Sequence, residues 1–351
     1  MVLFSIGMPS RLAEWCDMLI ARLAEPRLGT VERVALNTLD DIAVAVVKTR
    51  APNLLVCSRQ PVGRLQSEIV QSTRPFVVSV GDPRIALADL VERAGYDIAT
   101  ATRGAASSCA AMLNLIKAPG ALVIAIDDGR DPTTVAAQIA GHLDLPASGD
   151  EIAEIVAELA AAGFTPHFQG ENRATSGLGE RDQAVVNGAL LPYVSHMMLR
   201  QDLKPLVWEP ELFFINENAP APQPAAATRP VDVTGRVRHL VYGPFIDLPP
   251  GPWSANVVLG FSPETAGTGF VVEVFTGRQL AHTRIEAAAE QIIEADLHFV
   301  LDHTETQPVQ IRVANERAAF DGRLALGCVT LTPQATISSD TRERLATILR
   351  K

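Results

Sequence analysis

Residues 2–15 read VLFSIGMPSRLAEW and contain the signals that decide the fold. The apolar run Val2–Ile6 predicts a buried strand. The stretch Arg11–Ala24 predicts a helix because its apolar side chains recur near the helical period. Gly7 and Pro9 mark the turn between the two elements. A strand that passes through a tight turn into a helix is a typical start for an α/β domain.

The same alternation continues through the first 215 residues. Strand-like apolar runs at 53–57, 76–80 and 121–126 alternate with helical patterns at 85–94, 132–142 and 151–162. Strands separated by helices imply a parallel sheet that is covered on both faces. We therefore predict an α/β domain over residues 1–215.

The composition then changes. Residues 216–230 read NENAPAPQPAAATRP, which predicts an extended linker. Residues 231–335 show period-two patterning, as in VQIRV at 309–313, with Gly and Pro turn signals between the runs. This pattern predicts an all-β, jelly-roll-like sandwich. Residues 336–351 are expected to form a terminal helix or tail.

Charge and composition limit the classes of partner. The formal net charge of −10 disfavours a broad nucleic-acid or anionic-membrane surface, since such partners require a positive field. No apolar run is long enough for a transmembrane helix, and no signal peptide is evident, so we expect a cytoplasmic protein. The four cysteines are scattered and the histidines suggest no metal site. Asp127 and Asp128 follow a strand and predict either a loop cap or a Mg²⁺ site.

Four segments, in order, resemble the sulfotransferase family of the P-loop nucleotide-binding fold. The first is the turn from Gly7 to Trp15, which is similar to the family's Gly-x-Pro-Arg-Ser-Gly-Thr-Thr-Trp loop. The others are VCSRQP at 56–61, VGDPRIALADL at 80–90, and the run from Val123 to Leu145. The resemblance implies a P-loop-type parallel sheet that binds 3′-phosphoadenosine 5′-phosphosulfate.

The chain departs from that family in the loop that would hold the 5′-phosphosulfate. The family's cation, glycine and hydroxyl positions align with Ser10, Arg11, Leu12, Ala13 and Glu14. Leu12 replaces a glycine that allows close backbone approach, and Glu14 places an acid at the anion-binding end of the helix. Arg11 restores one cation, one position late.

The other expected contacts are lost as well. At the 3′-phosphate site the family's arginine and serine align with Gly81 and Asp89, although Arg84 of the motif is kept. At the position of the catalytic base the family's histidine aligns with Arg59, which stays protonated and cannot accept a proton. The family's late glycine-rich loop is only faintly similar to SGLGERD at 176–182. The resemblance thus implies no catalytic residue. It leaves Gly7, Pro9, Ser10, Arg11 and Arg84 as candidate nucleotide-binding residues.

The sandwich carries its own candidate site. Tyr242, Phe245 and Trp253 lie within a dozen residues, and the stretch 243–253 resembles carbohydrate-binding sandwiches attached to bacterial polysaccharide enzymes. Exposed rings of this kind stack against sugars. The alternative is that these rings pack in the core or contact a protein.

Three hypotheses about function follow. The first is a degenerate, non-catalytic sulfotransferase-like protein that needs no cofactor. It would bind a protein or a glycan, as a scaffold in bacterial cell-surface polysaccharide biosynthesis. The second is an active transferase with a relocated donor site, in which Arg11, Arg59 and Arg84 supply the cations and 3′-phosphoadenosine 5′-phosphosulfate is a possible donor. The third is a homo-oligomeric structural protein.

Overall fold

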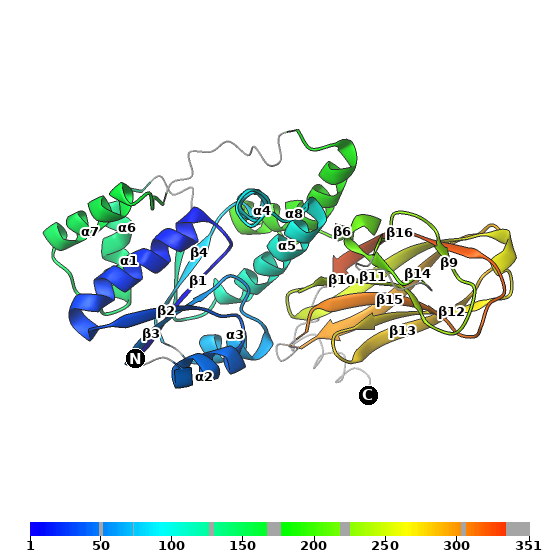
Figure 1. Cartoon of the computed structure of the whole chain (residues 1–351), viewed down its shortest axis with the longest axis horizontal. Helices are drawn as coiled ribbons and strands as arrows, with labels where there is room; N and C mark the ends of the chain where they lie inside the picture. Colours follow the sequence, from blue (N-terminus) through cyan, green and yellow to red (C-terminus); the bar gives the residue numbers. More distant parts are fainter. Residues whose placement is uncertain are drawn as a thin grey trace, which may run out of the picture.

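The structure is a computed structural model, and it describes residues 1–48, 52–72, 74–125, 130–166, 177–217, 225–302 and 307–334. A parallel α/β unit is followed along the chain by two antiparallel sheets, and the two parts lie side by side (Figure 1). This confirms the predicted fold class of an α/β sheet followed by a β-sandwich. The predicted terminal helix or tail lies outside the described residues, as do Asp127 and Asp128.

The α/β unit is built on a five-stranded parallel sheet in the order β2-β3-β1-β4-β5. β3 and β4 are buried along their whole length because helices cover both faces, which explains their continuous apolar sequence. The strand bounds are β1 Val2–Gly7, β2 Val31–Ala35, β3 Asn53–Ser58, β4 Phe76–Val80 and β5 Ala121–Ala125.

Helices form a layer on each face of this sheet. One face carries α1, Arg11–Leu28, with α6, Pro132–His142, and α7, Gly149–Ala161, packed beside it. The other face carries α3, α4, α5 and α8. Their bounds are α3 Gly63–Gln71, α4 Pro83–Glu92, α5 Ile98–Leu115 and α8 Glu180–Leu199, and α2 spans Leu39–Lys48.

The sandwich consists of a six-stranded sheet, β13-β12-β15-β10-β7-β8, and a second sheet, β14-β11-β16-β6, in which β9 also pairs with β16. Buried and accessible residues alternate along β11 and β14, so one face of each strand lies in the core. The bounds are β6 Leu206–Trp208, β7 Phe214–Ile215, β8 Ala225–Ala226, β9 Val231–Asp232, β10 His239–Ile246, β11 Gly251–Phe261, β12 Gly269–Phe275, β13 Gln279–Glu286, β14 Ile292–Leu301, β15 Val309–Asn315 and β16 Arg323–Pro333.

The chain enters the sandwich sheets earlier than the sequence analysis placed the boundary. β6 pairs with β16 and β7 pairs with β10, although both strands lie within the predicted α/β domain. β8, inside the predicted linker at 216–230, pairs with β7. These strands join the sandwich because Leu206, Trp208 and Ile215 bury their side chains in its core.

The two parts share one continuous hydrophobic core. Tyr193 of α8 and Trp208 of β6 are fully buried in the same cluster, which extends from the parallel sheet into the sandwich. Gly188 of α8 lies so close to β6 that an added Cβ would be 2.5 Å from the Val207 carbonyl oxygen. The absence of a side chain at Gly188 therefore allows helix and sandwich to touch.

Candidate functional site

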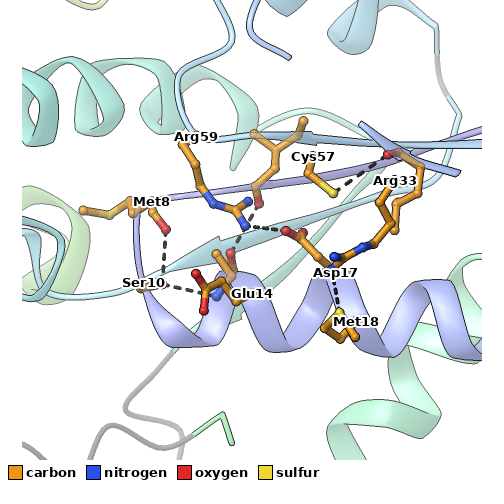
Figure 2. Close-up of polar contacts among 12 residues, drawn as sticks. Met8, Ser10, Glu14, Asp17, Met18, Arg33, Cys57 and Arg59 are labelled. Carbon is orange, nitrogen blue, oxygen red and sulfur yellow. Dashed lines mark hydrogen bonds and ion pairs between the residues drawn. The ribbon is translucent and has the colours of Figure 1, made fainter. Parts of the chain in front are cut away.

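The first candidate site lies at the carboxyl end of the parallel sheet, where β1 leads into α1. Met8, Pro9 and Ser10 form the whole connection and all three are buried, with Met8 only 2% exposed. The Ser10 hydroxyl donates to the Met8 carbonyl oxygen at 3.1 Å and accepts the Ala13 N–H at 3.2 Å (Figure 2). This contact is an ordinary N-cap, so Ser10 takes up an N–H that an anion would otherwise bind.

Gly7 has a packing role in this connection. A Cβ at Gly7 would lie 1.8 Å from the Ser79 Oγ and 3.1 Å from the Cβ of Ala13. β1 therefore approaches β4 and α1 too closely for any side chain at this position. This strand contact accounts for the glycine at the position that resembles the sulfotransferase motif, without reference to a phosphate.

Glu14 and Asp89, the two acids that the resemblance aligns with phosphate-binding positions, meet at one arginine. Arg93, which follows α4, donates to Glu14 at 2.5 Å and to Asp89 at 2.9 Å. Arg93 therefore holds two carboxylates in the region where the resemblance would place phosphate groups. The sequence motifs identified the two acids, but they gave no sign of Arg93, which lies 79 residues from Glu14.

Arg59, at the position of the expected catalytic base, forms an ion pair with Asp17 of α1. Figure 2 shows the Arg59 side chain reaching from the end of β3 to this carboxylate. Burial is the largest single influence and would lower the pKa of Arg59, but the charge of Asp17 and the hydrogen bond to it, with smaller contributions from Cys57 and Cys16, together raise the pKa. Arg59 thus remains a cation that is neutralised by the protein itself, and it accepts no proton.

The thiols beside this ion pair are unreactive at neutral pH. Burial, followed by the negative charge of Asp17, raises the pKa of Cys57 to about 12. The same two causes raise the pKa of Cys16 still further. Both side chains are therefore protonated, and they act as apolar packing groups.

The other two predicted cations are placed differently. Arg84 forms two contacts with its near neighbour Asp82 through Nε, at 3.0 and 2.9 Å, so a local carboxylate neutralises it. Arg11 is exposed and, within the described part of the chain, has no ion-pair partner. It borders a hollow of about 190 Å³ together with Glu14 and Arg93. The structure thus brings Arg11 and Arg59 to neighbouring parts of one sheet edge.

A larger cavity of about 380 Å³ opens between α1, β2 and the end of β3. Its charged lining includes Asp17, Arg59 and Arg33, and Phe164 forms part of its wall. The sequence analysis did not identify Asp17, Arg33 or Phe164. One available signal was Asp17 itself, a carboxylate on the apolar stripe of α1 between Cys16 and Leu19.

The second candidate site is an aromatic group on the outer face of the six-stranded sandwich sheet. Tyr242 lies 5.7 Å from Phe214 and 6.1 Å from Phe245, measured between ring centroids. The guanidinium of Arg103, from α5, lies 4.8 Å from the centroid of the Phe214 ring. We call Phe214, Tyr242 and Phe245 the aromatic triad. No sequence pattern points to Phe214, because its strand has only two residues.

Trp253 does not belong to this group. Its side chain is 2% exposed and its indole N–H donates to the Pro249 carbonyl oxygen at 2.9 Å. β11 turns the ring into the sandwich core, so its face is not open to a sugar. Of the two readings in the sequence analysis, core packing describes this tryptophan.

A polar row continues from the triad across the same sheet face. Tyr242 pairs across the strands with Arg312, which in turn pairs with Glu273. Arg312 donates to the Gln310 Oε1 at 3.1 and 3.0 Å, and its guanidinium lies 3.5 Å from the centroid of the Phe275 ring. These contacts fix the planar cation beside the triad.

Comparison with known protein families finds no match, and none of the curated proteins matches the chain. Among solved structures, the chain is similar to a xylan-binding module CBM15, with 14% identity, covering 36% of this chain and 96% of the module at a TM-score of 0.27. It is also similar to the C-terminal CBM6 of LamC from Zobellia galactanivorans, with 11% identity, 36% and 98% coverage and a TM-score of 0.23. At these TM-scores the likenesses carry no functional argument, and the site rests on its own geometry.

Within the described residues, no group of three or more His, Cys, Asp or Glu side chains could hold a metal ion. In the same part of the chain, every helix is too short or too polar to cross a membrane.

Proposed function

We propose that the protein is a non-catalytic binding protein whose sandwich binds a glycan on the outer face of the six-stranded sheet. The observation that carries this proposal is the placement of Phe245. A register shift interrupts the pairing of β10 with β15 between Pro244 and Ile246, and Phe245 has φ +65°. A positive φ is unusual for a bulky residue, and bulges often redirect a side chain near a binding site.

The result of this backbone conformation is an accessible ring beside Tyr242. Phe245 is 37% exposed and lies edge-on to Tyr242, with an interplanar angle of 83°. Aromatic faces stack on the C–H faces of sugar rings, and planar polar groups such as Arg312 bind their hydroxyls. A rigid aromatic group next to an orientated guanidinium therefore suits a carbohydrate chain.

The parallel sheet supports the non-catalytic part of the proposal. Ser10 caps α1, Arg93 holds Glu14 and Asp89, and Arg59 is paired with Asp17. Within the described residues, a sulfotransferase-like domain with these contacts has no base at the aligned position and no open phosphate loop. In this proposal the protein is a degenerate member of that family that serves as a glycan-binding scaffold in polysaccharide biosynthesis.

Affinity gel electrophoresis of the full chain, with neutral and anionic polysaccharides cast in the gel, tests the proposal. We expect at least one polysaccharide to retard the protein, and we expect Phe245→Ala and Tyr242→Ala to weaken this retardation about tenfold, as loss of a stacking contact predicts. Phe320→Ala is the matched control because Phe320 is 98% exposed and lies outside the triad. Retardation by no polysaccharide, or equal retardation of all three variants, would refute glycan binding by the triad.

A further inference from the structure

The cavity between α1, β2 and β3 is a second place where a ligand would fit, and it belongs to a different part of the molecule from the aromatic triad. Its volume of about 380 Å³ lies in the range of small-molecule sites, about 300 to 1,000 Å³. It lies beside the carboxyl ends of β2 and β3, the edge at which parallel α/β sheets usually bind ligands.

The charge of the lining favours an anion. Arg59 pairs with Asp17, and Arg93 pairs with Glu14 and with Asp89, so among the described residues Arg33 is the cation of the lining that is left for an anion. Arg33 is exposed, and its Nη1 contacts the Met18 Sδ at 2.5 Å. Within the described residues no carboxylate pairs with Arg33, so its charge is available to a ligand.

Two residues of the inner wall, Asp17 and Arg59, each have a buried polar atom without a partner among the described residues. Asp17 is 5% exposed and its Oδ1 has no hydrogen-bond partner among the described residues. The Nη1 of Arg59 is likewise buried without a partner. Buried polar atoms of this kind are costly, and a hydroxyl group is able to satisfy both because it accepts from one atom and donates to the other.

The remaining wall is apolar. Phe164 lies beside the cavity, and its N–H donates to the Leu159 carbonyl oxygen at 2.8 Å, which fixes this residue against the end of α7. The protonated thiol of Cys57 adds a second apolar surface. A ligand that suits all these walls has an anionic group, several hydroxyls and a compact ring.

We propose that this cavity binds a small phosphorylated sugar. The phosphate lies against Arg33 at the mouth, the hydroxyls reach the Asp17–Arg59 pair, and the ring packs on Phe164. This binding is independent of the aromatic triad, so either proposal stands if the other fails. It requires no chemical step, and it leaves the closed β1–α1 connection unchanged.

Thermal unfolding and isothermal titration calorimetry of the full chain test this proposal at low ionic strength. The probes are glucose 1-phosphate, ribose 5-phosphate, inorganic phosphate and glucose, each at millimolar concentration. We expect at least one sugar phosphate to raise the melting temperature more than inorganic phosphate does, and we expect glucose to have no effect. Arg33→Gln should weaken binding of that sugar phosphate about tenfold, as loss of a charged hydrogen bond predicts.

Arg22→Gln is the matched control, since Arg22 is an arginine of α1 that is half exposed and does not line the cavity. Circular dichroism verifies that both variants are folded. The proposal is overturned if no probe raises the melting temperature, or if inorganic phosphate stabilises the chain as much as either sugar phosphate. It is also overturned if Arg22→Gln weakens binding as much as Arg33→Gln does.

Discussion

The candidate side chains at the carboxyl end of the parallel sheet differ from those on the outer face of the sandwich in how accessible they are to a ligand. At the sheet end the β1–α1 connection is buried, and Arg59 and Arg93 are neutralised by the protein's own carboxylates. On the sandwich, Phe245 is held in an unusual backbone conformation that exposes its ring. In the first region the charged side chains are bound to one another, whereas in the second an aromatic side chain stays accessible.

The largest effect is expected from breaking the internal ion pair. Arg59→Met leaves Asp17 buried without a counter-charge, which should lower the free energy of unfolding by about 3 kcal/mol in urea titrations. The double variant Asp17→Leu with Arg59→Met removes both charges and should recover most of that loss. If the double variant is as unstable as the single variant, the pair does not act as a unit.

Within the sandwich, a buried aromatic residue can be compared with an accessible one. Trp253→Ala should lower the free energy of unfolding by about 3 kcal/mol because it empties a core position, while Phe245→Ala should change it by less than about 1 kcal/mol. Guanidinium titrations measure both values. Equal losses would show that Phe245 is a core residue and would remove the basis for an accessible triad.

The next largest loss of stability is expected at Gly7, where β1 lies close to β4 and α1. Gly7→Ala should cost about 2 kcal/mol, since the new Cβ meets Ser79 and overpacked cores lose stability on this scale. The same change in a Ser79→Ala background should cost less because the Oγ is gone. Thermal unfolding of the four proteins tests the assignment, and an unchanged cost in the second background would contradict it.

A smaller, pH-dependent effect is expected where the two parts meet. Asp247 accepts from the Gln60 Nε2 at 2.6 Å, and its N–H donates to the Ser107 Oγ at 2.9 Å. Burial raises the pKa of Asp247 above its ordinary value of 3.8. Because its pKa is raised, protonated Asp247 contributes to the free energy of unfolding. This contribution is full below pH 3.8 and is lost as the pH rises through the raised pKa.

Asp247→Asn should therefore flatten this part of the stability profile and raise stability at neutral pH relative to the native chain. Urea titrations at a series of pH values from 3.8 upward follow the difference. An identical pH dependence in both proteins would show that Asp247 does not carry the effect.

The last prediction is that a nucleotide leaves the melting temperature unchanged. If the β1–α1 connection is closed, then 3′-phosphoadenosine 5′-phosphate should leave the melting temperature unchanged at millimolar concentration. A clear shift that Arg11→Ala abolishes would favour the hypothesis of a relocated donor site over the closed loop.

Sequence reasoning worked where local pattern fixes structure, and it failed where contacts join distant segments. The strand–turn–helix at the N-terminus and the buried Trp15 follow from apolar periodicity within a few turns of chain. β6 and β7 have three and two residues, too few to show any period. They form strands only because they pair with β16 and β10 of the sandwich.

The candidate site shows the same limit. Arg59 and Glu14 were identified from motif positions, but their partners Asp17 and Arg93 lie in other segments and carry no motif. Likewise, a run of aromatics made both Tyr242 and Trp253 candidates either for stacking on sugars or for packing in the core. Only the strand register decides that the Tyr242 side chain lies on the outer face of its sheet and that the Trp253 side chain lies in the sandwich core.

The contact between Gly188 and β6 has a consequence for how the chain melts. Because Tyr193 and Trp208 lie in one cluster, a cut near residue 205 would leave large apolar surfaces uncovered on both fragments. The intact chain should therefore show a single calorimetric transition. A ligand bound at either end would then delay the melting of both halves together.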